Sequence, residues 1–196
     1  MQKYVLLGLG HHSDKVETAS KTSDACKVGS GIAKTCKDIK GIQSCTITLP
    51  SDQTTASLDL EHVVCTFYSD LYSDNRYRTG DSKKFPAKEL KVVSIVLGDA
   101  ASSSSLEETI QRGKAMAEGI YLSKDIVNAP HNVLNSLSLA NSAKRLADET
   151  ALTTTILEKD ECEARGMGSY LGVARGSETD PYFIHMVYTP KDGVVK

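Results

Sequence analysis

The sequence is 196 residues long, which is enough for one large domain or for a complete domain joined to part of another. Its 23 lysines and arginines nearly balance 25 aspartates and glutamates, and this formal net charge of -2 argues against a nucleic-acid binder that depends on a basic surface. No apolar run approaches the ~18 residues of a membrane-spanning helix, and five widely spaced cysteines indicate free thiols rather than a disulfide framework.

The first predicted elements are a strand and a helical stretch. Residues 4–10 form a short apolar run closed by glycine, which predicts a buried strand leading into a turn. From residue 14 to about residue 37 the apolar residues stand partly at helical spacing. This stretch predicts one or two helices, broken near Gly29 and Gly31.

Two more strands, with a helix between them, complete the first half. Residues 45–49 are rich in β-branched side chains and end at a proline, residues 56–72 carry a mixed helical pattern, and residues 91–97 are the clearest strand. The order strand, helix, strand, helix, strand predicts a layered α/β unit with parallel pairing.

A long helix is expected to connect this unit to a second one. Apolar residues lie roughly along one face from residue 106 to residue 124, and Ser105 stands in the N-cap position ahead of two glutamates. After a turn at Asn128, Ala129 and Pro130, the pattern restarts with Asn135 or Ser136 as the cap of a further helix. The elements expected after it are a strand at 153–157, a short helix at 159–165 ended by Gly166, and strands at 171–174 and 182–188.

Glycines and histidines near the amino terminus do not make a binding motif. Gly8 and Gly10 follow a predicted strand, but position 13 is a serine, so the dinucleotide-binding fingerprint lacks its third glycine. His11 and His12 have no carboxylate or third imidazole at a useful spacing, and we interpret them as an exposed loop.

The other histidines are isolated in the sequence. His62 and His131 have no partner at metal-ligand spacing. Alternation within the last predicted strand places His185 on one face with Phe183 and Val187. We therefore expect His185 to be a satisfied core or interface histidine.

No nucleophile stands in a recognisable catalytic pattern. The segment Arg165-Gly166-Met167-Gly168-Ser169 places its serine after the second glycine rather than between two glycines, and Cys162 has no identifiable partner. We interpret the acidic residues Asp160, Glu161 and Glu163 as a solvated helix face. A nucleophilic hydrolase is not supported.

Two longer strings carry a resemblance to a known family. From residue 117 the sequence reads AEGIYLSKDIVNAPHNVLNSLSLANSAKRLADE, and from residue 157 it reads LEKDECEARGMGSYLGVARGSETDPYFIHMVYTPKDG. The matching blocks are Ile126-Val127-Asn128 with Pro130, Asn132-Val133-Leu134, Gly166 to Ser169, Gly176-Ser177, and Pro181 ahead of a strand ending in Tyr188. These blocks resemble the start of the catalytic domain of leucyl aminopeptidases, the cytosol aminopeptidase family, and are most similar to its plant and algal members.

The resemblance covers residues 106–196 and, more loosely, residues 4–97, where Gly8-Leu9-Gly10 and Ser73-Asp74-Asn75-Arg76-Tyr77 match the later part of the family's amino-terminal domain. The chain departs from the family at Asn135-Ser136, where Thr-Pro is common, and at His131, where a small residue or proline is usual. Both departures keep a residue that can cap the helix. The expected fold is α/β, with a partial amino-terminal macro-like domain at 1–104, a linking helix at 105–127, and the truncated start of the catalytic domain at 128–196.

The resemblance implies a two-metal peptidase that releases amino-terminal residues from peptides. In the family, carboxylates and a lysine hold two divalent cations, manganese or zinc, an arginine binds bicarbonate, and all of these groups lie within or after a Val-Gly-Lys-Gly segment. This sequence stops at Lys196, just short of that segment. We therefore assign no catalytic, cofactor-binding or metal-binding residue in it, and we expect the chain to be a fragment truncated at both ends, without bound metal and inactive alone.

Several expectations about setting follow from the same resemblance. The full-length protein is expected to act on peptides as a homohexamer in the cytoplasm, or alternatively in a plastid, without binding a membrane. Some family members bind DNA, but the charge of this chain argues against nucleic acid. The alternative to an enzyme fragment is a non-catalytic module for oligomerisation or binding.

Overall fold

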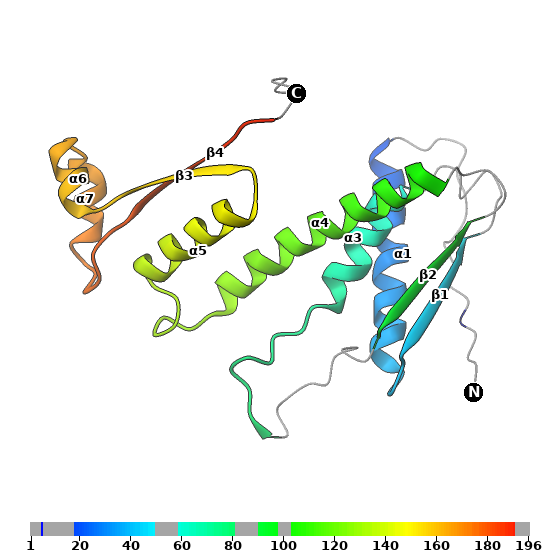
Figure 1. Ribbon diagram of the computed structural model, residues 1–196. Helices are drawn as coiled ribbons and strands as arrows, with labels where there is room; N and C mark the ends of the chain where they lie inside the picture. The colour runs from blue at the N-terminus through cyan, green and yellow to red at the C-terminus, as the bar shows by residue number, and fades with distance from the viewer. Residues whose placement is uncertain (1–4, 6–17, 50–58, 81–89, 98–102, 191–196) are drawn as a thin grey trace. The chain divides into compact units, whose positions relative to one another are not determined.

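The structure is a computed structural model that describes residues 5, 18–49, 59–80, 90–97 and 103–190 (Figure 1). The chain divides into two compact units, residues 1–125 and residues 126–196, and each is described by itself. Apart from Val5, the strand expected at residues 4–10 lies outside the described residues, as do His11 and His12. None of the helices within the described ranges combines the length and the apolar character needed to cross a membrane.

In its described residues, the first unit contains three helices and a parallel pair of strands. The helices are α1 (Thr18–Asp38), α3 (Leu60–Leu71) and α4 (Ser103–Asn128), whose last residues enter the second unit. Strands β1 (Ser44–Leu49) and β2 (Val92–Leu97) pair in parallel, with Ser44 opposite Val92 and Leu49 opposite Leu97. This register confirms the predicted parallel α/β unit, and Figure 1 shows the two strands side by side next to α1.

The core of this unit lies where α1 and α3 face the sheet. Phe67 of α3 belongs to this core and is 1% exposed. Burial of a side chain of this size contributes about 2 kcal/mol to the stability of the fold. Ile47 of β1 belongs to the same cluster, and Val93 and Ile95 of β2 pack against it. These apolar residues alternate with exposed ones along each strand, so one face of the sheet is buried and the other is open.

Helix α1 runs without interruption through both of its glycines, so the predicted break near Gly29 and Gly31 is wrong. The reason is close packing between helices. A Cβ atom added at Gly29 would lie 2.5 Å from the carbonyl oxygen of Val63 in α3. Glycine at this position allows two helix backbones to approach each other, and the tertiary contact offsets its low helix propensity.

Helix α4 begins at Ser103, two residues before the predicted cap at Ser105, and continues past the predicted end at residue 124 to Asn128. It meets α3 at Gly113, where an added Cβ would lie 2.7 Å from the carbonyl oxygen of Glu61. One turn further on, Ala117 is 2% exposed. Small residues at consecutive turns therefore give α4 its contact with α3.

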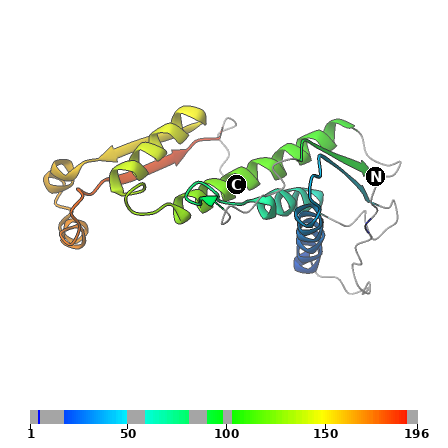
Figure 2. The same cartoon turned by 90° about the horizontal axis from the view of Figure 1, so that it is seen from below.

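The second unit contains a helix on an antiparallel strand pair. Helix α5 (Ser136–Glu149) precedes β3 (Leu152–Leu157), which pairs with β4 (Phe183–Tyr188), with Leu152 opposite Tyr188 and Leu157 opposite Phe183. Figure 2 shows α5 lying along this strand pair. The short helices α6 (Lys159–Ala164) and α7 (Gly168–Ala174) lie between the two strands in sequence.

The start of α5 confirms the predicted cap, and Asn135 is the residue that provides it. Its side chain accepts a hydrogen bond from the backbone amide of Ser138 at 3.0 Å, and the Ser138 hydroxyl contacts the backbone amide of Asn135 at 2.7 Å. This reciprocal pair satisfies two amides that a helix terminus otherwise leaves without partners.

The strand predicted at residues 171–174 is wrong, because these residues form most of α7. Tyr170, Leu171 and Ala174 are half-buried, whereas Gly172 and Val173 are exposed. Partly buried residues at this spacing belong to one side of a helix, and four residues are too few to separate a period of 3.6 from a period of 2. The short helix predicted at 159–165 is confirmed as α6 and ends before Gly166.

Candidate functional site

A polar network fixes the segment after α3 to the end of α4. Arg76 donates from Nε to Oδ1 of Asp74 at 3.0 Å and from Nη2 to Oδ2 at 2.9 Å, which is a two-pronged pairing. Nη2 also donates to the carbonyl oxygen of Asp125 at 2.9 Å and lies 3.0 Å from its Oδ1. Tyr72 donates its hydroxyl to the same carboxylate at 2.7 Å.

This arrangement sets the charges of its members. The hydrogen bonds from Arg76 lower the pKa of Asp74 from 3.8 to about 2, and the carboxylate of Asp74 in turn raises the pKa of Arg76. A permanently charged guanidinium and a carboxylate this acidic exchange no proton near neutral pH. The network is therefore built to hold the backbone in place rather than to carry protons.

Further contacts join α3 and α4 in the same region. Lys124 donates to the carbonyl oxygen of Ser69 at 2.9 Å, and its Nζ lies 5.3 Å from the centre of the Tyr72 ring. The hydroxyl of Tyr121 donates to the carbonyl oxygen of Tyr68, and burial raises the pKa of Tyr121. Each of these polar groups has a backbone partner or a ring partner, which is the pattern of a structural interface between helices.

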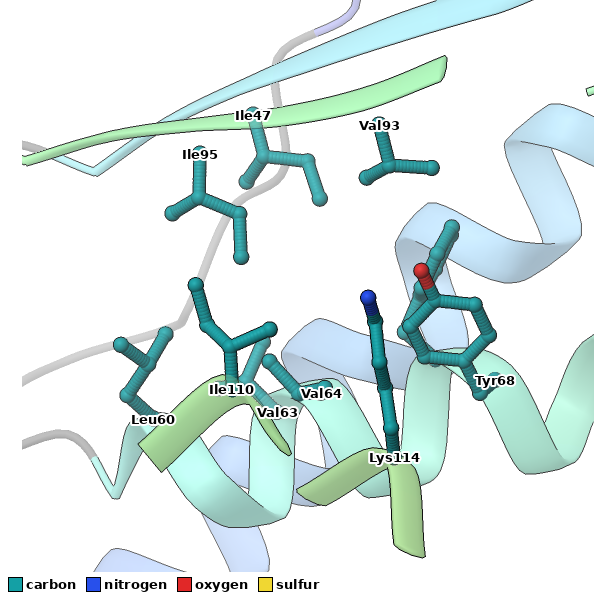
Figure 3. Close-up of a pocket in the computed structure, with 10 residues that line it drawn as sticks. Ile47, Leu60, Val63, Val64, Tyr68, Val93, Ile95, Ile110 and Lys114 are labelled. Atoms are coloured by element: carbon teal, nitrogen blue, oxygen red, sulfur yellow. The ribbon is translucent and has the colours of Figure 1, made fainter. Parts of the chain in front are cut away.

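A cavity of about 60 Å³ lies between the sheet and helices α3 and α4 (Figure 3). Lys114 of α4 and Tyr68 of α3 are its polar side chains, and Figure 3 shows the amine of Lys114 and the hydroxyl of Tyr68 on the same side of the space. Its other lining residues are apolar: Ile47, Leu60, Val63, Val64, Phe67, Val93, Ile95 and Ile110. The cavity holds no pairing of a nucleophile with a base, so it is core space and not a catalytic pocket.

In the second unit, the segments that resemble leucyl aminopeptidases come together. Ser136, the first residue of α5, donates its hydroxyl to the carbonyl oxygen of Asp180 at 2.6 Å. Lys159 of α6 lies with Nζ 3.8 Å from Oδ1 of Asp180. A depression of about 510 Å³ lies beside them. Its polar lining comes from α6 and from the segment between α7 and β4, with Arg175 and Thr179 in that segment, and its lining from α7 is glycine and apolar residues. These contacts are structural, because they join the segment before β4 to helices α5 and α6.

Three of the histidines singled out in the sequence are described, and each has a local setting of its own. Nδ1 of His62 is 2.8 Å from Oδ2 of Asp59, the residue that caps α3, so this pair belongs to a helix start. His131 is exposed in the turn after α4. His185 is also exposed, together with Phe183 and Val187 on the same face of β4. Of the two alternatives expected for it, the core histidine is wrong and the interface histidine stays a prediction. Among the described residues, the helix packed on this strand pair is α5, and alternation along β4 did not indicate which of its two faces that helix covers.

The remaining candidates behave as structural or solvated residues. Cys162 is fully buried and its thiol lies 3.8 Å from the carbonyl oxygen of Leu157. Asp160, Glu161 and Glu163 are exposed on α6, which confirms the solvated helix face. Within the described ranges, no group of three or more histidine, cysteine, aspartate or glutamate side chains could hold a metal ion. The described residues therefore do not fit a pair of divalent cations.

Sequence reasoning missed the network of Tyr72, Asp74, Arg76 and Asp125 as a functional unit. The pairing of Asp74 with Arg76 could have been predicted from the sequence, because the two residues stand two positions apart after the end of a helix. The contact with Asp125 could not, since Asp125 lies 49 residues beyond Arg76 and only the packing of α4 brings the two together. The network positions two elements, and its members touch no reacting group in the structure.

Comparison with known proteins shows which proteins these segments resemble in sequence. Residues 121–196 match the family model described as the catalytic domain of the cytosol aminopeptidase family. A probable cytosol aminopeptidase of Picosynechococcus sp. is 37% identical over 191 residues, covering 97% of this chain and 36% of the relative. That of Gloeobacter violaceus is 32% identical over 198 residues, covering 97% and 38%. The chain thus spans little more than a third of the length of these relatives.

Among solved structures, a tomato leucine aminopeptidase mutant matches with a TM-score of 0.72 and 24% identity, over 94% of this chain and 35% of that chain. At this identity the likeness shows the fold, and it covers both units of the chain. The α/β fold expected from the sequence is therefore confirmed.

Proposed function

The chain belongs to the cytosol aminopeptidase family, and we propose that it forms part of a metal-dependent leucyl aminopeptidase that releases amino-terminal residues from peptides. The observation that carries this proposal is the continuous alignment of the chain with probable cytosol aminopeptidases over 97% of its length, including residues 121–196 in the catalytic-domain match. A chance match to one short motif would not extend through both units.

Within that enzyme, we assign the chain a scaffold role. Residues 1–104 are the partial amino-terminal domain, residues 105–127 the linking helix, and residues 128–196 the start of the catalytic domain. The polar network at Arg76 and the cap at Asn135 support this assignment, because both fix backbone segments rather than reacting groups. Two divalent cations, manganese or zinc, would be bound by other parts of the aminopeptidase, and the polypeptide of this sequence alone would be inactive.

The test is a chimaeric enzyme. The part of the Picosynechococcus relative that aligns with this chain would be replaced by the chain, and hydrolysis of a leucine anilide would be measured with manganese. We expect turnover that depends on the metal. The 196-residue chain alone and the relative lacking the exchanged part are the two controls, and both should give no turnover.

A chimaera that melts cooperatively and does not hydrolyse the anilide would contradict the proposal. A second chimaera that exchanges only residues 121–196 separates the two units, because it tests the catalytic-domain match without the first unit. Hydrolysis by the isolated 196-residue chain would contradict the inactivity that we assign to it.

The alternative is a non-catalytic module for oligomerisation or binding. Val127 is 81% exposed and Val173 is 85% exposed, but single exposed apolar side chains are normal on protein surfaces and do not by themselves indicate a contact surface. Two folded and inactive chimaeras, together with a chain that sediments as a defined oligomer, would favour the module over the enzyme.

We also propose that the complete enzyme is a cytoplasmic homohexamer, with a plastid location as the alternative. The name cytosol aminopeptidase, carried by both relatives, supports the cytoplasmic location. Immunoblotting of cytosolic and plastid fractions with an antibody to this chain would distinguish the two compartments. The intact mass of the recognised protein, compared with the 21.1 kDa of this chain, would show whether the aminopeptidase is one longer polypeptide.

A further inference from the structure

A depression of about 540 Å³ lies in the first unit, between the end of α1, the end of α3 and the last turns of α4. Three lysines line it, with Lys34 and Lys37 on α1 and Lys124 on α4. Residues three positions apart on a helix share a face, so α1 presents two ammonium groups to this space. The packing of the helices adds the third from a distant part of the chain.

Two carboxylates also line the depression, those of Asp38 and Asp70. Asp70 accepts a hydrogen bond from the hydroxyl of Ser30. Among the residues that the structure describes, neither aspartate forms an ion pair with any of the three lysines. Three positive charges against two negative ones leave the wall of the depression with a surplus of one positive charge.

The three lysines retain hydrogen-bond donors for a ligand. Lys34 is exposed and makes no hydrogen bond or ion pair within the described ranges. Lys37 donates to the carbonyl oxygen of Tyr72 over a long 3.5 Å. Lys124 donates to the carbonyl oxygen of Ser69 at 2.9 Å, and its Nζ lies 5.3 Å from the centre of the Tyr72 ring. Because an ammonium group has three N–H donors, these contacts occupy only part of the set.

Compensation of helix ends explains two of these lysines and leaves the third unexplained. Lys37 and Lys124 bind carbonyl groups at or just beyond the end of α3, where a helix leaves its carbonyl groups without partners. Lys34 stands a full turn before the end of α1 and binds no such group among the described residues. Its charge therefore remains available beside the two anchored lysines.

We propose that this depression binds a phosphate group, either free or in a small phosphate ester, through Lys34, Lys37 and Lys124. A phosphate dianion offers acceptor oxygens in several directions, and lysine binds it as a compact point charge with freely rotating donors. Small-ligand sites have volumes of about 300–1,000 Å³, so the depression also has room for an organic part beyond the phosphate.

The affinity is expected to be modest. Asp38 and Asp70 repel an anion, and the carbonyl ends of α1 and α3 carry partial negative charge towards the same space. We expect a dissociation constant on the order of 1 mM for a simple phosphate ester. This inference does not rest on the proposed aminopeptidase activity, because it concerns binding by residues of this chain alone.

The test is a titration of the full 196-residue chain, labelled with ¹⁵N and followed by NMR at constant ionic strength. Glycerol 3-phosphate is the probe, glycerol is the matched uncharged control, and inorganic phosphate is titrated separately. We expect saturable shifts at the amides around Lys34, Lys37 and Lys124 with glycerol 3-phosphate and none with glycerol. Both phosphate compounds should bind there; tighter binding of the ester assigns the site to esters, and equal affinity assigns it to phosphate itself.

Three variants test the role of the individual charges. Lys34→Gln should raise the dissociation constant about tenfold, because a hydrogen bond between two charged groups is lost. Lys27→Gln is the matched control on the same helix: Lys27 pairs with Asp24 at 2.8 Å and does not line the depression, so binding should be unchanged. Asp38→Asn removes a repulsive charge and should lower the dissociation constant about threefold.

Thermal melts show that each variant is folded before its binding is compared. The absence of saturable binding to the unchanged chain would overturn the proposal. Equal losses in Lys34→Gln and Lys27→Gln would do the same, because they would indicate only the general charge of α1. Weaker binding by Asp38→Asn would also overturn it, since that carboxylate would then contact a positive group of the ligand.

Discussion

Arg76 holds Asp74 and Asp125 together, although these two carboxylates are 51 positions apart and belong to a loop and to the last turns of α4. Its guanidinium pairs with both oxygens of Asp74 and donates to the carbonyl oxygen of Asp125 at 2.9 Å. The carbonyl groups at the end of a helix lack partners within the helix, and a cation there also interacts favourably with the helix dipole. The contact therefore ties a carbonyl group in the last turn of α4 to the segment after α3.

Replacement of this arginine should lower stability in proportion to the hydrogen bonds lost. Arg76→Ala is expected to reduce the unfolding free energy by about 1 kcal/mol, because the side chain is 41% exposed and solvent screens part of its charge. Arg76→Lys keeps the charge but cannot reproduce the two-pronged geometry, so it should recover only part of the loss. Urea denaturation of the chimaeric enzyme measures both. Full recovery by lysine would show that charge alone matters.

The acidity of Asp74 predicts a specific dependence on pH. Its pKa in the folded protein is about 2, below the ordinary value of 3.8, so folding favours the ionised form. The stability that this carboxylate contributes is present above pH 4 and is lost as the pH falls from about 4 towards 2. Asp74→Asn should be less stable than the unchanged protein at pH 6, and the difference should shrink in this window. Melting temperatures measured at several pH values provide the test, and a constant difference would contradict it.

Two glycines of α4 form a matched pair for testing the packing of α3 on α4. Gly113→Ala should destabilise the protein by about 2 kcal/mol, because the new methyl group would lie 2.7 Å from the carbonyl oxygen of Glu61. Gly119→Ala adds the same methyl group where nothing lies within 4 Å, and it should stabilise the helix by about 0.5 kcal/mol. Thermal melts of the two variants should therefore shift in opposite directions. Equal shifts would show that the helices do not pack closely at Gly113.

The capping box at the start of α5 should be worth a measurable amount on its own. Asn135→Ala removes the acceptor for the amide of Ser138 and should cost about 1 kcal/mol. Asn135→Asp keeps an acceptor at the same place and adds a favourable interaction with the helix dipole, so it should be neutral or slightly stabilising. Hydrogen exchange at the first amides of α5 reports the effect locally. Unchanged protection in the alanine variant would argue against the cap.

The local chemistry of the sequence determined much of the element order. Strands β1, β2, β3 and β4 and the cap at Asn135 were predictable, because β-branched runs and capping side chains act on their own neighbours in the chain. The parallel pairing of β1 with β2 also followed, since a helical crossover between two strands favours it. The family resemblance rested on strings of this local kind.

Only the tertiary structure decided the features that depend on contacts between distant residues. Gly29 of α1 lies where the backbone of α3 occupies the space that a side chain would need, and the four residues 171–174 are too short a pattern to separate a helix from a strand. Asp125 meets Arg76 through the packing of α4. A sequence pattern records the neighbours of each residue along the chain, whereas these relationships depend on the free energy of packing one element against another.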